Sequence, residues 1–122
     1  MYKVIEISSK EEWERYAKGV SHSNILQSYA WGEFQKALGR KVWFLAVEEE
    51  ISQNLSHKKI VGLALAQLIP TKLRTHIYIS NGPVFLTEDA KQKYEILNTL
   101  KLFLKDLGKK NNVNFVRMDP LL

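Results

Sequence analysis

Hydrophobic and polar residues alternate along the chain with a period that changes repeatedly between strand-like and helix-like. Residues 2–7 alternate with a period of two and include β-branched residues, which predicts a first strand. Ser9 followed by Glu12 is typical of a capping box, so a helix should begin next and span 10–19. One face of this helix would carry four apolar residues: Trp13, Tyr16, Ala17 and Val20.

The stretch 24–39 predicts a second helix and raises the question of a binding site. Ser28 is a suitable N-cap for a helix over 29–38, and Gly39 is a suitable residue to end it. Its inner face should consist of Trp31, Phe34 and Leu38.

Two long apolar runs then predict neighbouring strands over 41–47 and 60–69, and the polar stretch 48–59 between them predicts a hairpin loop. Residues 76–80 form a further predicted strand. Asn-Gly-Pro does not continue regular structure easily, so 81–86 should be a loop.

The last third of the chain predicts a long helix and a final strand. Thr87 is the expected N-cap of a helix over 88–108, and residues 113–118 form the last predicted strand. The buried side of the helix should consist of Ile96, Leu97, Leu100, Phe103, Leu104 and Leu107.

The predicted order β-α-α-β-β-β-α-β indicates a single α/β (α+β) unit over residues 1–122, with a mixed, mostly antiparallel sheet flanked by helices. The N-acyltransferase fold of the acetyltransferase type begins with this succession and normally continues with another helix and two strands. We therefore expect an incomplete version of that fold. Its edge at 113–118 would expose backbone groups that a second copy of the chain could pair with.

Composition narrows the class of protein. The chain has 122 residues, of which 45% are hydrophobic, and it contains no Cys, which excludes disulfides and thiolate metal sites. Without a signal segment or a membrane-spanning run, a cytoplasmic protein is expected. Residues 1–50 carry 8 acidic and 7 basic side chains, whereas residues 51–122 carry 5 and 11. The basic half indicates either a phosphate-bearing partner or a solvated Lys-rich surface. His22, His57 and His76 lack metal-ligand spacing.

Three motifs together resemble the Fem family of peptidoglycan-bridge aminoacyltransferases, which includes methicillin resistance proteins. They are "LQSYAWGEFQKALGRKVWFLAVE", "YISNGPV" and "FVRMDP", and they occur in the family's order over about residues 25–120. Family members resemble two tandem acyltransferase-like domains, so this chain would correspond to the N-terminal portion only. The resemblance implies a transferase of cell-wall synthesis that moves an amino acid from aminoacyl-tRNA to the stem-peptide amine of a precursor.

The first motif supplies two candidate substrate-binding residues, Tyr29 and Lys36. Its aromatic side chains suit core packing as well as a binding site, and Gln27 suits either capping or ligand contact. In the family, a Lys after the "WGEF"-like segment is associated with the precursor's phosphates. Gln35 stands at the matching position here, and Lys36 lies beside it.

The other motifs supply Asn81, Gly82 and Arg117 as candidate substrate-binding residues and Asp119 as the candidate catalytic residue. Asn81 and Gly82 belong either to an ordinary turn or to a substrate-lining loop. A carboxylate at Asp119 could accept a proton from an amine, cap the next segment, or pair with Arg117.

The resemblance implies aminoacyl-tRNA and a lipid- or nucleotide-linked peptidoglycan precursor as partners, peripheral membrane contact, and no cofactor. Direct attack of an amine on an activated ester needs positioning and stabilisation of charge rather than an enzyme nucleophile. The chain alone supplies no clear donor to stabilise an oxyanion, so we expect it not to catalyse aminoacyl transfer by itself. The alternative is a non-catalytic module of the same fold that binds a nucleotide-sugar precursor, RNA or a partner subunit.

Overall fold

The computed structural model describes residues 1–18, 25–50, 58–72 and 74–120. The elements are β1 (Tyr2–Glu6), α1 (Lys10–Lys18), the 3-10 turn η1 (Ile25–Gln27), α2 (Tyr29–Ala37), β2 (Val42–Glu50), β3 (Lys58–Ile69), β4 (His76–Ile79), β5 (Val84–Phe85), α3 (Ala90–Lys110) and β6 (Phe115–Met118). The eight predicted elements are all present in the predicted order, and η1 and β5 are additional.

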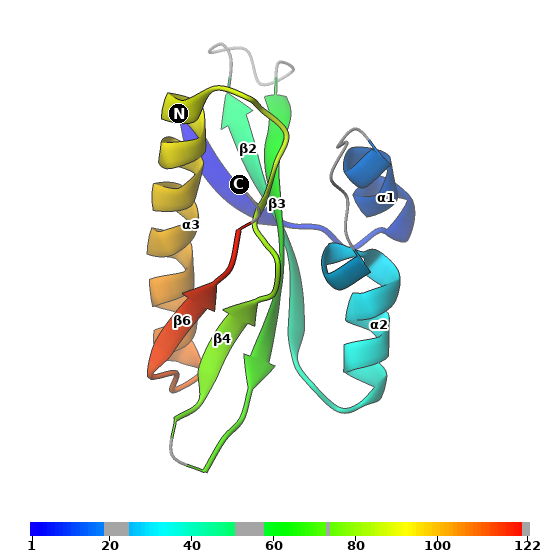
Figure 1. The fold of residues 1–122 in the computed structure, drawn as a ribbon, viewed down its shortest axis with the longest axis vertical. Helices are drawn as coiled ribbons and strands as arrows, with labels where there is room; N and C mark the ends of the chain where they lie inside the picture. Colours follow the sequence, from blue (N-terminus) through cyan, green and yellow to red (C-terminus); the bar gives the residue numbers. More distant parts are fainter. Residues whose placement is uncertain (19–24, 51–57, 73, 121–122) are drawn as a thin grey trace.

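One sheet joins the strands in the order β1-β2-β3-β4-β6, with β5 paired to β3 (Figure 1). Strands β4 and β6 are parallel, whereas the other neighbours are antiparallel. This confirms the mixed, mostly antiparallel sheet. Strands β2 and β3 pair as far as Glu50 and Lys58, so both extend into the stretch predicted as a loop. The rest of that stretch, residues 51–57, lies outside the described residues.

Helices cover both faces of the sheet, with α3 on one face and α1 and α2 on the other (Figure 1). Successive strand residues point to opposite faces of the sheet. Because helices cover both faces, the central strands carry apolar side chains on both sides. On the α3 side, Leu45 and Ile96 are fully buried in the same cluster. On the opposite side, Phe44 meets the buried Trp13 edge-on, with ring centroids 5.3 Å apart. Each such buried side chain contributes about 1.5–3 kcal/mol relative to an exposed one.

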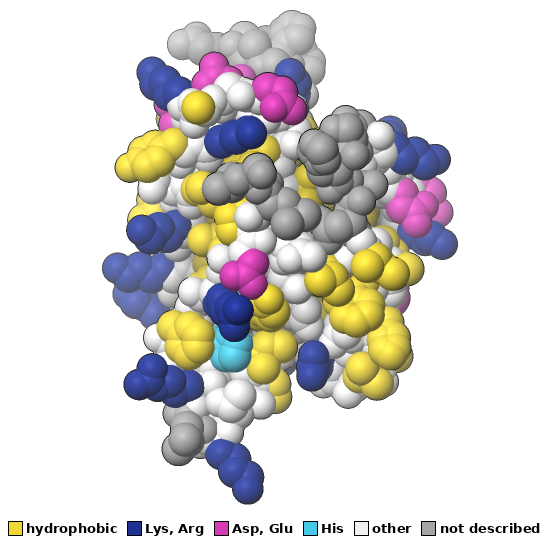
Figure 2. Space-filling model, in the orientation of Figure 1, with side chains coloured by type: hydrophobic (Ala, Val, Ile, Leu, Met, Phe, Trp, Pro, Cys, Tyr) yellow, Lys and Arg dark blue, Asp and Glu magenta, His cyan; other side chains and the backbone are white. Residues whose placement is uncertain are grey.

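The predicted inner face of α2 is wrong for two of its three residues. Phe34 is 47% exposed and Leu38 is 62% exposed, while Trp31 is half-buried and stacks on Phe34 at 5.6 Å. Hydrophobic side chains accordingly gather on the surface over α2 (Figure 2). The helix buries Gly32 and Gln35 instead.

Close packing on Phe44 explains this rotation of α2. A Cβ added to Gly32 would lie 2.3 Å from Cζ of Phe44, so only glycine lets the helix approach the ring. Gln35 stays buried because its Oε1 accepts a hydrogen bond of 2.8 Å from Arg40.

Two of the three predicted helix caps are confirmed. The hydroxyl oxygens of Ser9 and Ser28 each accept a hydrogen bond from the backbone N–H three residues further on. The third is wrong, because Asp89 and not Thr87 caps α3, accepting from Gln92 N at 3.1 Å. Thr87, two residues before this cap, instead accepts a hydrogen bond from Asp89 N through its Oγ1.

The buried side of α3 agrees with the sequence pattern. Ile96, Leu100 and Leu104 are buried, and Leu97, Phe103 and Leu107 are half-buried. The prediction of a loop over 81–86 is wrong for Val84 and Phe85, which form β5 and pair with Leu63 and Gly62 of β3.

Strand β6 lies at the end of the sheet, as predicted. In the part of the chain that the structure describes, it pairs with β4 and with no other strand. Pairing of this edge with a second copy stays a prediction. Across the described ranges, no helix combines the length and the apolar character needed to cross a membrane.

Candidate functional site

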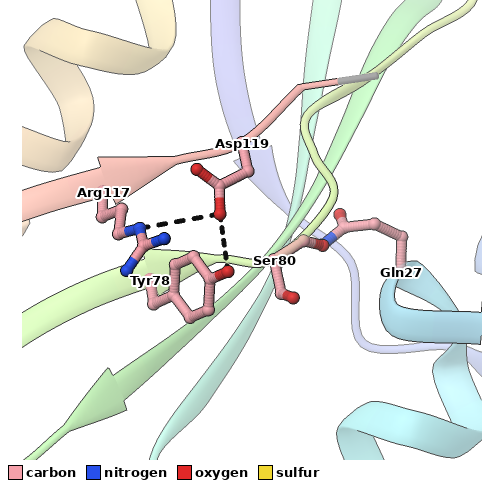
Figure 3. A network of polar contacts seen from close by, with 5 residues as sticks. All are labelled: Gln27, Tyr78, Ser80, Arg117 and Asp119. Carbon is pink, nitrogen blue, oxygen red and sulfur yellow. Dashed lines mark hydrogen bonds and ion pairs between the residues drawn. The ribbon is translucent and has the colours of Figure 1, made fainter.

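Asp119 lies in a small polar cluster with Tyr78 and Arg117, which come from β4 and β6 (Figure 3). The Tyr78 hydroxyl donates a hydrogen bond of 2.6 Å to Asp119 Oδ2. Arg117 Nε lies 3.6 Å from the same oxygen, and the guanidinium carbon lies 5.0 Å from the Tyr78 ring centroid. The Asp119 side chain is 39% exposed, so the carboxylate is held in place but remains open to solvent.

The parallel pairing of β4 and β6 brings these residues together. Tyr78 is the direct partner of Arg117, so both side chains point to the same face of the sheet. The pairing continues one residue past β6, where Asp119 N donates to Ile79 O at 3.3 Å. Pro120 then favours an extended Asp119. The carboxylate therefore lies where both parallel strands end.

A row of polar side chains crosses the sheet from α2 to this cluster. Gln67 of β3 is the direct partner of Tyr78, which is in turn the partner of Arg117. On the other side of Gln67, Arg40 Nη1 lies 3.5 Å from Gln67 Oε1 and 2.8 Å from Gln35 Oε1. We call these residues the polar row: Gln35, Arg40, Gln67, Tyr78, Arg117 and Asp119. It extends across the sheet from Gln35 of the first motif to Asp119 of the third.

Gly82 and Asn81 belong to a turn that is held by Gln27. The Gln27 amide nitrogen donates to Ser80 O at 2.7 Å, and its oxygen accepts from Leu65 N at 2.8 Å. Figure 3 shows the Gln27 side chain reaching toward Ser80. A Cβ on Gly82 would lie 2.6 Å from Gln27 Cδ, so the turn needs glycine there. Asn81 has φ 53°, a conformation that Asn tolerates better than most residues. Gln27 is thus a buried structural residue that clamps η1 to β3 and β4.

Tyr29 and Lys36 lie on α2, near Phe44. The Tyr29 ring stacks on Phe44 with centroids 4.5 Å apart, and the Lys36 ammonium lies 5.6 Å from the centre of the same ring. Burial, with a smaller contribution from Glu33, raises the pKa of Tyr29. Lys36 pairs with Glu33 at 3.5 Å. Among the described residues, no hydrogen bond, ion pair or ring contact joins Tyr29 or Lys36 to Asp119.

Tyr29 also lines a pocket of about 360 Å³ between α1, η1 and the start of α2. Trp13, Gln27 and Val84 contribute to its largely apolar wall. The six predicted site residues therefore fall into two places. Tyr29 and Lys36 lie on α2, and Asn81, Gly82, Arg117 and Asp119 lie where β4 and β6 end.

The sequence-based prediction missed Tyr78, Gln67 and Arg40. Tyr78 and Gln67 belong to strands whose pattern indicated only β structure, and their neighbours in the sheet are distant in sequence. The described residues contain no group of three His, Asp or Glu side chains placed to hold a metal ion. His76 instead stacks on Phe115, with centroids 4.6 Å apart.

Comparison with known proteins identifies the family. A sequence model of the FemAB family matches residues 8–122, and the chain belongs to this family. This confirms the Fem-type resemblance at the level of the family. A search of curated protein sequences found no match.

Two solved structures share the fold. FemX superimposes with a TM-score of 0.59 at 19% identity, over 85% of this chain and 24% of the FemX chain. The tetramutant of the BH1408 protein from Bacillus halodurans also gives a TM-score of 0.59, at 17% identity, over 97% of this chain and 82% of that chain. The chain thus spans about a quarter of the length of FemX.

Proposed function

We propose that this chain forms part of an aminoacyltransferase of peptidoglycan-bridge synthesis, as an N-terminal acyltransferase-like domain. Such an enzyme would transfer an amino acid from aminoacyl-tRNA to the stem-peptide amine of a cell-wall precursor. The observation that carries the proposal is the FemAB family match over residues 8–122. The polar row supports it, because it places a fixed carboxylate at the exposed ends of two parallel strands.

In this proposal Asp119 receives the acceptor amine. Tyr78 and Arg117 both engage Oδ2, whereas Oδ1 makes no hydrogen bond to any residue in the described ranges. Oδ1 is therefore the oxygen that would accept a hydrogen bond, and then a proton, from the amine. Because Tyr78 and Arg117 fix the carboxylate from one side, they are positioning residues.

The transfer step needs no covalent enzyme intermediate. The amine nitrogen attacks the ester carbonyl carbon, an amide bond forms, and the bond from that carbon to the ribose oxygen of tRNA breaks. One proton leaves the amine through Asp119, and the departing ribose oxygen takes up a proton to become a hydroxyl. Positioning of the two substrates supplies much of the rate in such reactions.

The remaining candidate residues would bind the precursor. Lys36 offers a charge for a phosphate if its ammonium leaves Glu33, an exposed pairing that costs little to break. Tyr29 would contact the same molecule from α2, and Asn81 and Gly82 would line it from the turn after β4.

Titration of the chain with a nucleotide-linked peptidoglycan precursor tests this function. We expect Asp119→Asn to weaken binding by about 10- to 150-fold, because a charged hydrogen bond to the amine contributes about 1.5–3 kcal/mol. Asp106→Asn is the matched control, since Asp106 pairs with Lys110 on the exposed side of α3. Unchanged binding by Asp119→Asn would remove Asp119 from the site. Aminoacyl transfer from charged tRNA, measured with any longer product of the same locus, should fall in the same variant.

A second candidate function is a non-catalytic module that binds the same precursor, RNA or a partner subunit. The pairing of Asp119 with Arg117 favours it, because this ion pair already engages one oxygen of the carboxylate. Precursor binding without aminoacyl transfer by any product of the locus would support this module over the transferase.

A further inference from the structure

Arg40 lies at the α2 end of the polar row, and the way α2 ends fixes its backbone. Gly39 has φ 89°, and its N–H donates to Lys36 O at 2.9 Å. The N–H of Arg40 donates to Gln35 O at 3.1 Å. These two hydrogen bonds form a Schellman motif, in which the chain turns back over the last helical turn. Arg40 is therefore brought back beside Gln35.

Two buried amide side chains fix the direction of the Arg40 guanidinium. Its Nη1 donates to Gln35 Oε1 at 2.8 Å and lies 3.5 Å from Gln67 Oε1. Both glutamines are only 4% exposed, although burying an amide is costly unless it makes hydrogen bonds. Arg40 itself is exposed, so its guanidinium is held from the protein side and faces solvent on the other.

The rest of the guanidinium is unused. Both contacts are made by Nη1, and neither Nε nor Nη2 has a hydrogen-bond or ion-pair partner in the part of the chain that the structure describes. The edge formed by Nε and Nη2 is suited to binding a carboxylate or a phosphate through two parallel hydrogen bonds. Because its partners are neutral amides, Arg40 also keeps its charge uncompensated, whereas Lys36 pairs with Glu33.

The polar row relates this edge to Asp119. Gln67 pairs with Tyr78, and Tyr78 pairs with Arg117, so the three side chains share one face of the sheet. Neighbouring strands lie about 4.8 Å apart, so the Cα atoms of Gln67 and Arg117 are about 10 Å from each other. A ligand with an amine and an anionic group a similar distance apart would reach both Asp119 and Arg40.

We propose that Arg40, positioned by Gln35 and Gln67, binds an anionic group of a ligand, a carboxylate or a phosphate, through its Nε and Nη2 atoms. In one respect this rests on the proposed function, under which the group belongs to the acceptor whose amine meets Asp119. No bond forms or breaks at Arg40. It is a binding residue that favours acceptors with a negative charge near the amine.

A structural role is the competing explanation, because a cation near the C-terminus of a helix stabilises that helix. Nuclear magnetic resonance titration with inorganic phosphate and with acetate separates the two and assumes no function. The Nε–H signal of Arg40 should shift and saturate with at least one anion. Arg15, which lies over the Tyr16 ring on α1, is the internal control. An Arg40 signal that moves no more than that of Arg15 would overturn the proposal.

Titration with the nucleotide-linked precursor measures the contribution of Arg40 to affinity. Arg40→Gln should weaken binding by about 10- to 150-fold, the range for a charged hydrogen bond. Arg40→Lys should recover only part of this loss, because an ammonium lacks the planar pair of donors. Lys41→Gln is the matched control, since it removes the same charge from a residue that contacts Asn111 at 3.4 Å instead. Equal weakening by Lys41→Gln would overturn the site.

Gln35→Met tests the positioning of the guanidinium, because it removes the acceptor and keeps the charge of Arg40. We expect weaker precursor binding at unchanged net charge, with urea denaturation showing that the variant is folded at the temperature of the titration. If Arg40→Gln and Gln35→Met lower only the free energy of unfolding and leave the affinity unchanged, Arg40 is a structural residue and the proposal fails.

The two parts of the precursor distinguish the sources of the anionic group, because the nucleotide part carries phosphates and the stem peptide carries carboxylates. The part whose affinity falls in Arg40→Gln contains the group that Arg40 binds. Phosphate or acetate binding at Arg40 without any precursor binding would refute the proposed function and support the anion site. Precursor binding that depends on Asp119 and not on Arg40 would refute the anion site and leave the proposed function intact.

Discussion

Tyr78 and Asp119 show how a single hydrogen bond fixes the candidate site. We expect Tyr78→Phe to lower the free energy of unfolding by about 1 kcal/mol, because it removes the donor to a half-exposed carboxylate. In an Asp119→Ala background the same substitution should cost almost nothing. Urea denaturation of the four variants measures the coupling, with the exposed Tyr94→Phe as control. Equal costs in both backgrounds would mean that the hydrogen bond does not form in solution.

Gly82 packs closely against Gln27, so a side chain at position 82 would displace Gln27 from its hydrogen bonds. A methyl group at Gly82 would collide with Gln27 Cδ and with Ile79 Cγ2, which lies 2.8 Å away, so Gly82→Ala should cost about 1–3 kcal/mol. Gly108→Ala is a suitable control, since its added carbon would meet Val113 at an ordinary 3.5 Å and improve helix propensity. Thermal denaturation should show a lower Tm only for the first variant. A Gly82→Ala protein as stable as the wild type would show that the turn is not clamped by Gln27.

The residues of the candidate site differ in how far the sequence could predict them. Arg117 and Asp119 are two positions apart, so their pairing was among the alternatives that the sequence offered. Tyr78 is 41 residues from Asp119, and Gln27 is 53 residues from Ser80. Contacts of this range depend on which strands become neighbours, and no local pattern contains that information.

At the scale of elements, α2 shows what periodicity can and cannot predict. Its bounds and its cap follow from Ser28 and the residues after it, because these interactions are local. Its rotation does not, because Phe34 and Leu38 have the right spacing for a buried face and yet face solvent. The close approach between Gly32 and Phe44 decides the orientation.

This orientation of α2 is testable by substitution. Leu38→Gln should change the free energy of unfolding by less than about 0.5 kcal/mol, as expected for an exposed residue. Gly32→Ala should destabilise the protein by about 1–3 kcal/mol despite its better helix propensity, because the added carbon meets the buried Phe44 ring. Urea denaturation measures both. The opposite ranking would restore the face that the apolar spacing predicted.

For the whole molecule, the sequence predicted the succession of elements and the edge position of β6 more completely than the site. The succession depends on patterns within each element, whereas the site depends on how β4 and β6 meet. The structure also shows where charged side chains of the acidic and basic halves of the chain lie. Several lysines of the basic half lie on α3, and acidic residues of the first half lie on α1 and at the end of β2.

Tyr2 connects β1 to β2 and α3, and its ionisation should therefore affect the stability of the whole fold. Burial, supported by Glu49 and Glu95, raises the pKa of Tyr2 from 10.0 to about 12. Burial also raises the pKa of Tyr29 on the other side of the sheet. A raised pKa in the folded state means that the folded protein keeps these protons after the unfolded chain has released them. The stabilisation is complete below pH 10 and is lost as the pH rises toward 12.

We therefore expect the free energy of unfolding to fall between pH 10 and pH 12, and to fall less steeply in Tyr2→Phe, which has no proton to lose. Urea denaturation at pH 9, 10 and 11 measures the slope, and ultraviolet titration of tyrosinate absorbance gives the ionisation directly. Lysine deprotonation contributes equally to both proteins, so the difference between their slopes isolates Tyr2. Parallel pH profiles for wild type and Tyr2→Phe would show that the hydroxyl reaches solvent and does not couple β1 to the rest of the sheet.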